Sequence, residues 1–102
     1  MQVKIPKRIK IAGHWVGVRR KRKVDKNEDS LGYAKYTHDE IELATSFLKK
    51  PIPESKCAEI FLHEIIHHVA DKYSVNMREK DVHLMSAGLF QVIRDNKLDF
   101  SK

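Results

Sequence analysis

Residues 54–73 read ESKCAEIFLHEIIHHVADKY, and this stretch decides the fold. Pro51 and Pro53 lie just before it, and proline disfavours helical geometry in the preceding residue, so a helix should begin after them. We predict an amphipathic helix from Glu54 to about Tyr73 that packs on the core. Its buried face should be the apolar stripe of Ala58, Phe61, Leu62, Ile65, Ile66, Val69 and Tyr73.

A second helix is expected after a short turn at residues 74–77. Asn76 with Glu79 three residues later is typical of a capping box, so this helix should begin there and run to about Arg94. Two helices joined by a short turn are expected to lie antiparallel. The predicted buried stripe of the second helix consists of Val82, Met85, Leu89, Val92 and Ile93.

The first half of the chain is strand-like. Residues 8–18 read RIKIAGHWVGV, in which apolar residues alternate on both sides of a break at Gly13, and this pattern predicts a hairpin. Residues 32–36 and 41–43 form a second strand pair around a polar turn. Strands followed by helices indicate an α+β fold. We predict a small N-terminal antiparallel β-sheet of two hairpins, packed on two antiparallel helices.

Length and cysteine content suggest one domain in a reducing compartment. A chain of 102 residues has about the usual size of one domain, so a single domain over residues 1–102 is expected. No apolar run approaches the roughly 18 residues of a membrane-spanning helix, and no membrane partner is expected. The one cysteine, Cys57, has no disulfide partner in the chain, which favours the cytoplasm. Cys57 itself should be buried.

The formal net charge of +6 is concentrated early in the chain. Residues 1–26 hold ten lysines and arginines against one acid, Asp25, and the densest run extends from Arg19 to Lys23. Such a run can bind the phosphates of nucleic acid, but it contains no interleaved aromatic residues on which bases would stack. A solvated strand end or loop is the favoured interpretation. A basic nucleic-acid-binding module is an alternative that we do not favour.

The first predicted helix contains the pattern HExxH, with His63, Glu64 and His67 at its fixed positions. Residues i and i+4 share a face, so the two imidazoles can reach one ion, while Glu64 points to a neighbouring sector. At about 100° per residue, the two histidines lie away from the predicted apolar stripe. The pattern therefore predicts a zinc site on the face opposite the core.

A third protein ligand is expected, because catalytic zinc normally has three and keeps one position for water. The second helix should supply it from roughly four to six residues after its start, at about 1.5 Å per residue. His83 fits that depth best, and Glu79, one turn earlier, is the alternative third ligand. His68 projects about 100° away from His67 and is expected in polar packing, or as an outer hydrogen-bond partner of a metal ligand, instead.

These motifs resemble the minimal single-domain zincin metallopeptidases of the phage and prophage type and, more distantly, ImmA-like and SprT-like domains. The resemblance covers residues 31–96 best. It rests on LHEIIHHV at residues 62–69, on the hairpin that begins at Gly32-Tyr33 and ends in IEL at residues 41–43, and on the helix EKDVHLMSAGLFQVIRDN at residues 79–96. It implies a zinc-dependent metallopeptidase that hydrolyses peptide bonds of a peptide or protein substrate. It also implies Zn²⁺ on His63 and His67, with Glu64 as general base on a zinc-bound water.

The resemblance has further implications for the site. The third ligand in these families is often a glutamate, which keeps Glu79 beside His83. The strand at residues 41–45 should lie at the sheet edge and pair with an extended peptide substrate. A donor for the developing oxyanion is also expected, with Tyr33, Tyr36 and Tyr73 as candidates. A catalytically silent zinc-binding protein of the same fold, which binds a host protein without cleaving it, is a second alternative.

Overall fold

The computed structural model describes residues 5–22, 24 and 30–98 of the chain. The elements in chain order are β1 (Arg8–Ile11), β2 (His14–Lys21), β3 (Gly32–Lys35), a 3-10 turn (Tyr36–His38), β4 (Glu40–Ala44), β5 (Ser46–Phe47), β6 (Lys50–Pro51), α1 (Glu54–Lys72) and α2 (Glu79–Asp95). Strands thus precede helices, and the predicted α+β fold with two helices is confirmed.

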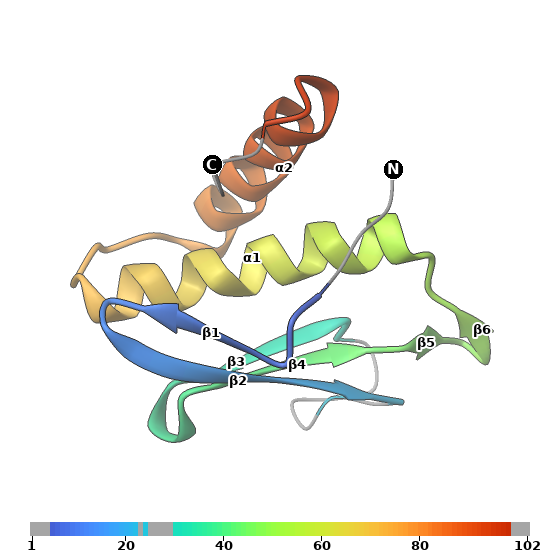
Figure 1. The fold of residues 1–102 in the computed structure, drawn as a ribbon, viewed down its shortest axis with the longest axis horizontal. Coiled ribbons are helices and arrows are strands. Elements are labelled where there is room, and N and C mark those ends of the chain that lie inside the picture. The colour runs from blue at the N-terminus through green and yellow to red at the C-terminus, as the bar shows by residue number, and fades with distance from the viewer. Residues whose placement is uncertain (1–4, 23, 25–29, 99–102) are drawn as a thin grey trace.

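The four main strands form one sheet in the order β1-β2-β4-β3 (Figure 1). Both expected hairpins are present, β1 with β2 and β3 with β4, and each pairs antiparallel. The hairpins meet through parallel pairing of β2 with β4, in which Val18 lies opposite Ile41. The sheet is therefore mixed, and the prediction of a wholly antiparallel sheet is corrected at this one pair.

β4 is a central strand, so the prediction that residues 41–45 lie at the sheet edge is wrong. Both faces of β4 are covered, because Ile41 and Leu43 belong to the core and Glu42, on the other face, has no exposed surface. A strand buried on both faces is expected to have neighbours on both sides. The edge of the sheet on this side is β3, which lies beside α1.

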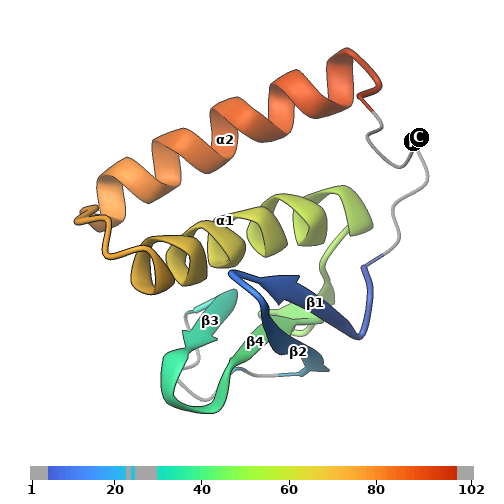
Figure 2. The same ribbon diagram turned by 60° about the vertical axis from the view of Figure 1, so that its left-hand side comes forward.

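Both helices lie on the same side of the sheet (Figures 1 and 2). α1 lies on the sheet, and α2 lies on α1 and runs back in the opposite direction (Figure 2). The core between the sheet and α1 consists of Ile11, Val16, Val18, Ile41, Leu43 and Ile60. The other face of the four-stranded sheet carries no helix in the part of the chain that the structure describes.

The buried line of α1 differs from the predicted apolar stripe. The most deeply buried residues of α1 are Cys57, Ile60, Glu64 and His68. Val69 and Tyr73 of the predicted stripe are 37% and 63% exposed, and Phe61 and Ile65 are only partly buried against the core. α1 lies between the sheet and α2. Its apolar residues are therefore divided between the side that contacts the sheet and the side that contacts α2, and polar residues lie between these two sides. Cys57 is buried, as predicted.

α2 packs mainly on α1 and buries little of its own surface. Val82 and Ser86 are its buried residues, whereas Met85, Leu89 and Val92 of the predicted stripe are exposed. A helix with one neighbour needs only a narrow buried line, which explains why most of that stripe is solvent-accessible. Neither helix in the described part of the chain is long and apolar enough to cross a membrane.

Asp81, and not Glu79, caps the start of α2. The backbone N–H of Arg78 donates to Asp81 Oδ2 at 3.2 Å, and the Arg78 guanidinium donates to the same carboxylate at 3.0 Å. The capping pair predicted at Asn76 and Glu79 therefore lies two residues too early. As the first residue of α2, Glu79 takes no part in this cap, and its carboxylate is directed at α1.

Candidate metal centre

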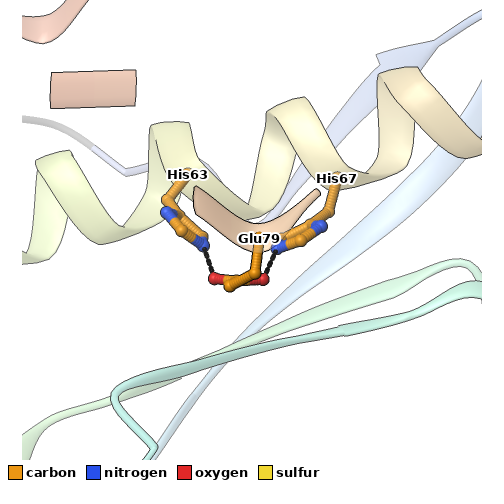
Figure 3. A group of neighbouring side chains, drawn as sticks. All are labelled: His63, His67 and Glu79. Carbon is orange, nitrogen blue, oxygen red and sulfur yellow. Dashed lines mark hydrogen bonds and ion pairs between the residues drawn. The ribbon is translucent and has the colours of Figure 1, made fainter. Parts of the chain in front are cut away.

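Two histidines from the middle of α1 and one glutamate from the first residue of α2 converge between the two helices (Figure 3). His63 Nε2 lies 2.7 Å from Glu79 Oε1, and His67 Nε2 lies 2.9 Å from Glu79 Oε2. One ligand atom from each of the three residues lies within 4.8 Å of the other two. His63 and His67, one helical turn apart, thus lie side by side as predicted.

The chemistry of the three groups suits a zinc ion. The two Nε2 atoms face the two carboxylate oxygens of Glu79, so the donor atoms of all three groups are gathered in one place. Two imidazole nitrogens and one carboxylate oxygen form one of the ligand sets of catalytic zinc sites. The side chains of His63 and His67 are 16% and 21% exposed and that of Glu79 is 67% exposed, so the centre opens to solvent.

Ser86 is a site residue that the sequence reasoning missed. Its hydroxyl is buried, donates to the backbone carbonyl of His83 at 3.0 Å, and lies 3.4 Å from His63 Nδ1. In metal-binding histidines, a hydrogen-bond partner at the second ring nitrogen usually fixes the orientation of the ring, and the Ser86 hydroxyl lies where it could be that partner for His63. The available signal was spacing, because Ser86 follows Glu79 by seven residues and so shares its side of α2.

The geometry favours Glu79 over His83 as the third ligand. His83 is exposed, and its ring centroid lies 6.3 Å from that of His63, whereas the Glu79 carboxylate contacts both histidines. His83 still lines the same cleft. The prediction of His83 counted residues from the expected start of the second helix. Its outcome therefore depended on where α2 begins and on how α2 is rotated about its axis.

Glu64 lies on the buried side of the site, against the edge strand β3. Its side chain is 6% exposed and lines the cleft with His63 and His67. A Cβ atom at Gly32 would lie only 2.7 Å from Glu64 Oε2 and 2.8 Å from Ile60 Cγ2, which is closer than real Cβ atoms approach their neighbours. The absence of a side chain at Gly32 therefore makes room for the Glu64 carboxylate.

The cleft itself has a volume of about 430 Å³ and runs between β3 and the two helices. Tyr33 and Tyr36 line it, while Tyr73, the third candidate oxyanion donor, is 63% exposed and does not. Burial, followed by the nearby carboxylates of Asp71, Glu64 and Glu79, raises the pKa of Tyr36 above its usual value of 10.0. The Tyr36 phenol therefore stays protonated and can donate a hydrogen bond.

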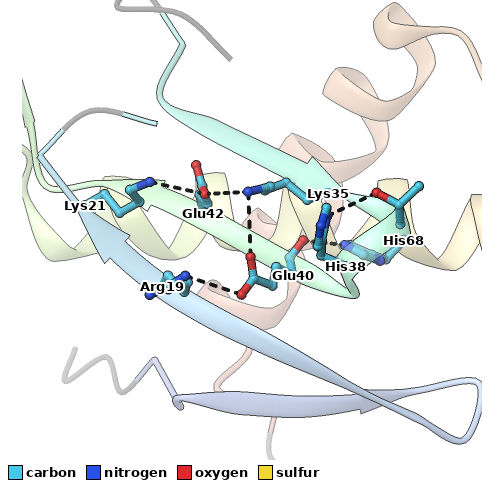
Figure 4. A network of polar contacts seen from close by, with 8 residues as sticks. Arg19, Lys21, Lys35, His38, Glu40, Glu42 and His68 are labelled. Atoms are coloured by element: carbon cyan, nitrogen blue, oxygen red, sulfur yellow. Dashed lines mark hydrogen bonds and ion pairs between the residues drawn. The ribbon is translucent and has the colours of Figure 1, made fainter. Parts of the chain in front are cut away.

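His68 faces the sheet, although it follows His67 directly (Figure 4). It is fully buried, its Nε2 donates to the backbone carbonyl of Glu40 at 2.8 Å, and its ring meets Tyr36 edge to face at 5.2 Å. Burial lowers the pKa of His68, which favours the neutral ring that this single hydrogen bond requires. The expected polar packing of His68 is what the structure has.

The basic run from Arg19 to Lys23 is not a continuous surface. Arg20 points towards α1, where its guanidinium pairs with Glu54 at 2.9 Å and contacts Cys57 Sγ at 3.5 Å. Arg19 and Lys21 lie on the other face of the sheet and contact carboxylates of β4. Lys23 lies outside the described residues. The run is thus divided between two faces by the alternation of side chains along β2.

Comparison of the chain with models of protein families, with curated proteins and with solved structures found no match. The resemblance to the zincins therefore stays a prediction that rests on the HExxH pattern, and the structural observation that supports a metal centre is the addition of Glu79 to His63 and His67.

Proposed function

We propose that this chain is a zinc-dependent metallopeptidase. The observation that carries the proposal is the convergence of two imidazole Nε2 atoms from α1 and one carboxylate from α2 within 4.8 Å of one another. The contact of His63 Nδ1 with the buried Ser86 hydroxyl gives further support, because it orients Nε2 towards that centre. A cleft beside this centre leaves space for a substrate.

Each site residue has a role in this proposal. His63, His67 and Glu79 hold the ion, and when bound, zinc lowers the pKa of a water molecule towards about 7 and polarises the substrate carbonyl. Glu64 takes the proton from the attacking water and delivers it to the leaving amine. Tyr36, which lines the cleft, donates its O–H to the developing oxyanion.

The proposed substrate is an extended peptide bound beside β3. Gly32, Tyr33 and Ala34 of this strand line the cleft, and β3 is an edge strand of the four-stranded sheet. An extended peptide can add to such an edge through main-chain hydrogen bonds, with alternate side chains entering pockets. The peptide-pairing strand of the proposal is thus β3, in place of residues 41–45.

We place the activity in the cytoplasm. The lone cysteine, Cys57, is buried between α1 and Arg20, and burial raises the pKa of its thiol. A thiol held in its protonated form is unreactive. Such a thiol is compatible with a reducing compartment, in which a fold without disulfides depends on its core alone.

Elemental analysis of the purified protein tests the metal. The wild type should carry stoichiometric zinc, and His63→Ala, His67→Ala and Glu79→Ala should each lose it. His83→Ala is the matched control and should retain zinc, because its ring lies outside the three-residue centre. Retention by Glu79→Ala together with loss by His83→Ala would reverse the choice of third ligand. A wild type without zinc ends the proposal.

Cleavage of unfolded, fluorescently labelled casein by the zinc-loaded protein tests the reaction. Glu64→Gln should lower the rate by about 10²- to 10⁴-fold, the usual contribution of general acid–base catalysis, while zinc is retained. Glu54→Gln, on the same helix but outside the cleft, is the matched control. A zinc-loaded wild type no faster than Glu64→Gln would favour the catalytically silent alternative.

A further inference from the structure

The sheet face that points away from the helices, called here the outer face, is rich in positive charge. Alternation along the strands places the core residues on one side and the remaining side chains on the other. The outer face carries the cations Arg8, Lys10, Arg19, Lys21 and Lys35 and the carboxylates Glu40 and Glu42. On the described strands, the outer face thus carries five cations and two carboxylates.

The two carboxylates of the outer face are shielded (Figure 4). Glu42 is fully buried, and the ammonium groups of Lys21 and Lys35 each lie 3.4 Å from its Oε2. The Glu40 side chain is 24% exposed, and Arg19 lies 3.5 Å from its Oε2. The exposed charges of this face are therefore mainly those of Arg8, Lys10 and Arg19, the last with a side chain 62% exposed.

An exposed aromatic ring lies among these cations. Trp15 is 50% exposed on β2, with the Arg8 guanidinium 3.9 Å and the Lys10 ammonium 5.1 Å from its ring centroid. Trp15 is two pleats from Arg19 on the same side of β2, so ring and cations form one surface. The basic run itself contains no aromatic residue, but Trp15 precedes it on the same strand, and pairing of β1 with β2 brings Arg8 and Lys10 beside the ring.

We propose that the outer face binds single-stranded nucleic acid. Arg8, Lys10 and Arg19 contact successive phosphates, and an unstacked base lies against Trp15, the combination that nonspecific single-strand binders use. In a duplex the bases are stacked on one another, so no base is available to stack on the Trp15 ring. A lipid surface is a poorer fit, because Trp15 is the one exposed large hydrophobic residue on the described outer face.

The chain offers a direct reporter, since Trp15 is its single tryptophan. Titration with a 20-nucleotide oligothymidylate at low salt should quench the intrinsic fluorescence. Three phosphate contacts on a single strand predict a slope of about −2 in a plot of log affinity against log salt. Removal of zinc with a chelator should leave both results unchanged, so the outcome is independent of the proposed peptidase.

Variants are compared by the anisotropy of a fluorescein-labelled oligothymidylate. Trp15→Ala should weaken binding by about 5-fold or more, the usual effect of losing one stacking contact. Arg8→Glu with Lys10→Glu should weaken binding further and flatten the salt slope. Lys49→Glu with Lys50→Glu is the matched control, because it changes the net charge equally on exposed residues of the separate β5–β6 hairpin. Circular dichroism confirms that each variant is folded.

Several outcomes would overturn the proposal. If the Arg8→Glu, Lys10→Glu and Lys49→Glu, Lys50→Glu double variants weakened oligonucleotide binding equally, binding would respond to net charge alone. Equal affinity of wild type and Trp15→Ala, or binding of duplex DNA as tight as that of the single strand, would remove the ring from the site. Binding of phosphatidylserine vesicles with a blue shift of Trp15 emission, and no quenching by the oligonucleotide, would assign the face to a membrane.

Discussion

His67 and His68 are neighbours in the sequence, yet α1 places them in opposite surroundings. His67 is directed at Glu79 and the open centre, whereas His68 is fully buried and bonded to the Glu40 carbonyl. The rotation of about 100° per residue along a helix is sufficient to separate them. One face of α1 is thus free to bind a ligand because the other face, through His68 and its neighbours, is fixed to the sheet.

The largest expected effects come from replacing these two histidines one at a time. His67→Ala should weaken zinc binding by more than about 100-fold, the upper limit for losing only an outer hydrogen-bond partner of a ligand. Its urea unfolding in the absence of zinc should remain close to that of the wild type. Zinc titration with a competing chelator measures the first effect.

His68→Ala should instead lower the stability of the fold and leave zinc binding nearly unchanged. It leaves a cavity and an unpaired carbonyl of Glu40, and we expect the free energy of unfolding to fall by about 2–4 kcal/mol. The zinc affinity of the remaining folded protein should change little. If His68→Ala lost zinc as readily as His67→Ala while staying equally stable, the separation of the two faces would be wrong.

A methyl group at Gly32 tests the sheet-side support of Glu64. Gly32→Ala should lower the free energy of unfolding by about 1–3 kcal/mol through overpacking, and should reduce peptidase activity by displacing the Glu64 carboxylate. Gly17→Ala is a matched control in β2, because its Cβ would meet its nearest neighbour, Glu40 Cγ, at 3.9 Å, an ordinary contact. Equal stability of the two variants in urea would contradict the close approach.

Ser86→Ala tests how His63 is oriented. Loss of an outer hydrogen-bond partner typically weakens metal binding by about 10- to 100-fold, and we expect this range for zinc. Ser55→Ala, an exposed serine of α1, should leave zinc affinity unchanged. A Ser86→Ala variant with wild-type affinity would show that the hydroxyl does not orient the ring.

The smallest effect is expected at the ion pair between Asp39 and Lys72, 2.6 Å apart, which joins the sheet to the end of α1. The hydrogen bond from Lys72 lowers the pKa of Asp39 below its usual value of 3.8. The ionised carboxylate therefore adds stability above the unfolded-state pKa, and this contribution is lost as the pH falls through the folded-state pKa.

Asp39→Asn should accordingly be slightly less stable than the wild type at neutral pH, with a difference that vanishes in strong acid. The effect is small because the carboxylate is exposed and screened by solvent. Lys72→Met should remove the same pH dependence. Thermal unfolding from neutral to acidic pH measures both, and a difference that grew with acidification would have the wrong sign.

The helical pair and the convergence of His63 with His67 were predictable, because spacing of i and i+4 depends only on local helix geometry. The side chain of α2 that joins them was not predictable, since its identity depends on the residue at which α2 begins. Asp81 caps that helix, and this shift of two residues leaves Glu79 at the first position of α2, where its carboxylate reaches both histidines. Which of two nearby acidic residues caps a helix depends on tertiary packing, and that packing cannot be read from the sequence.

The rotation of α1 and the arrangement of the strands were also beyond the pattern. Apolar residues occupy most of the circumference of α1, so the stripe that contains the largest number of apolar residues is not the stripe that is buried. Ile60 and Glu64 face the sheet instead. Parallel pairing of β2 with β4 is a contact between hairpins, with no local turn to signal it. By contrast, the alternation that places Trp15 and Arg19 on one face was readable along β2.

α2 is attached to the rest of the molecule along a narrow line, with Val82 and Ser86 as its buried residues. Such a weakly anchored helix is the kind of unit that opens first in hydrogen exchange. Under the proposed function, an ion shared by His63, His67 and Glu79 would latch α2 to α1 at the end where the chain turns. Exchange protection across α2 would then rise and fall with zinc concentration, coupling the shape of the cleft to metal supply.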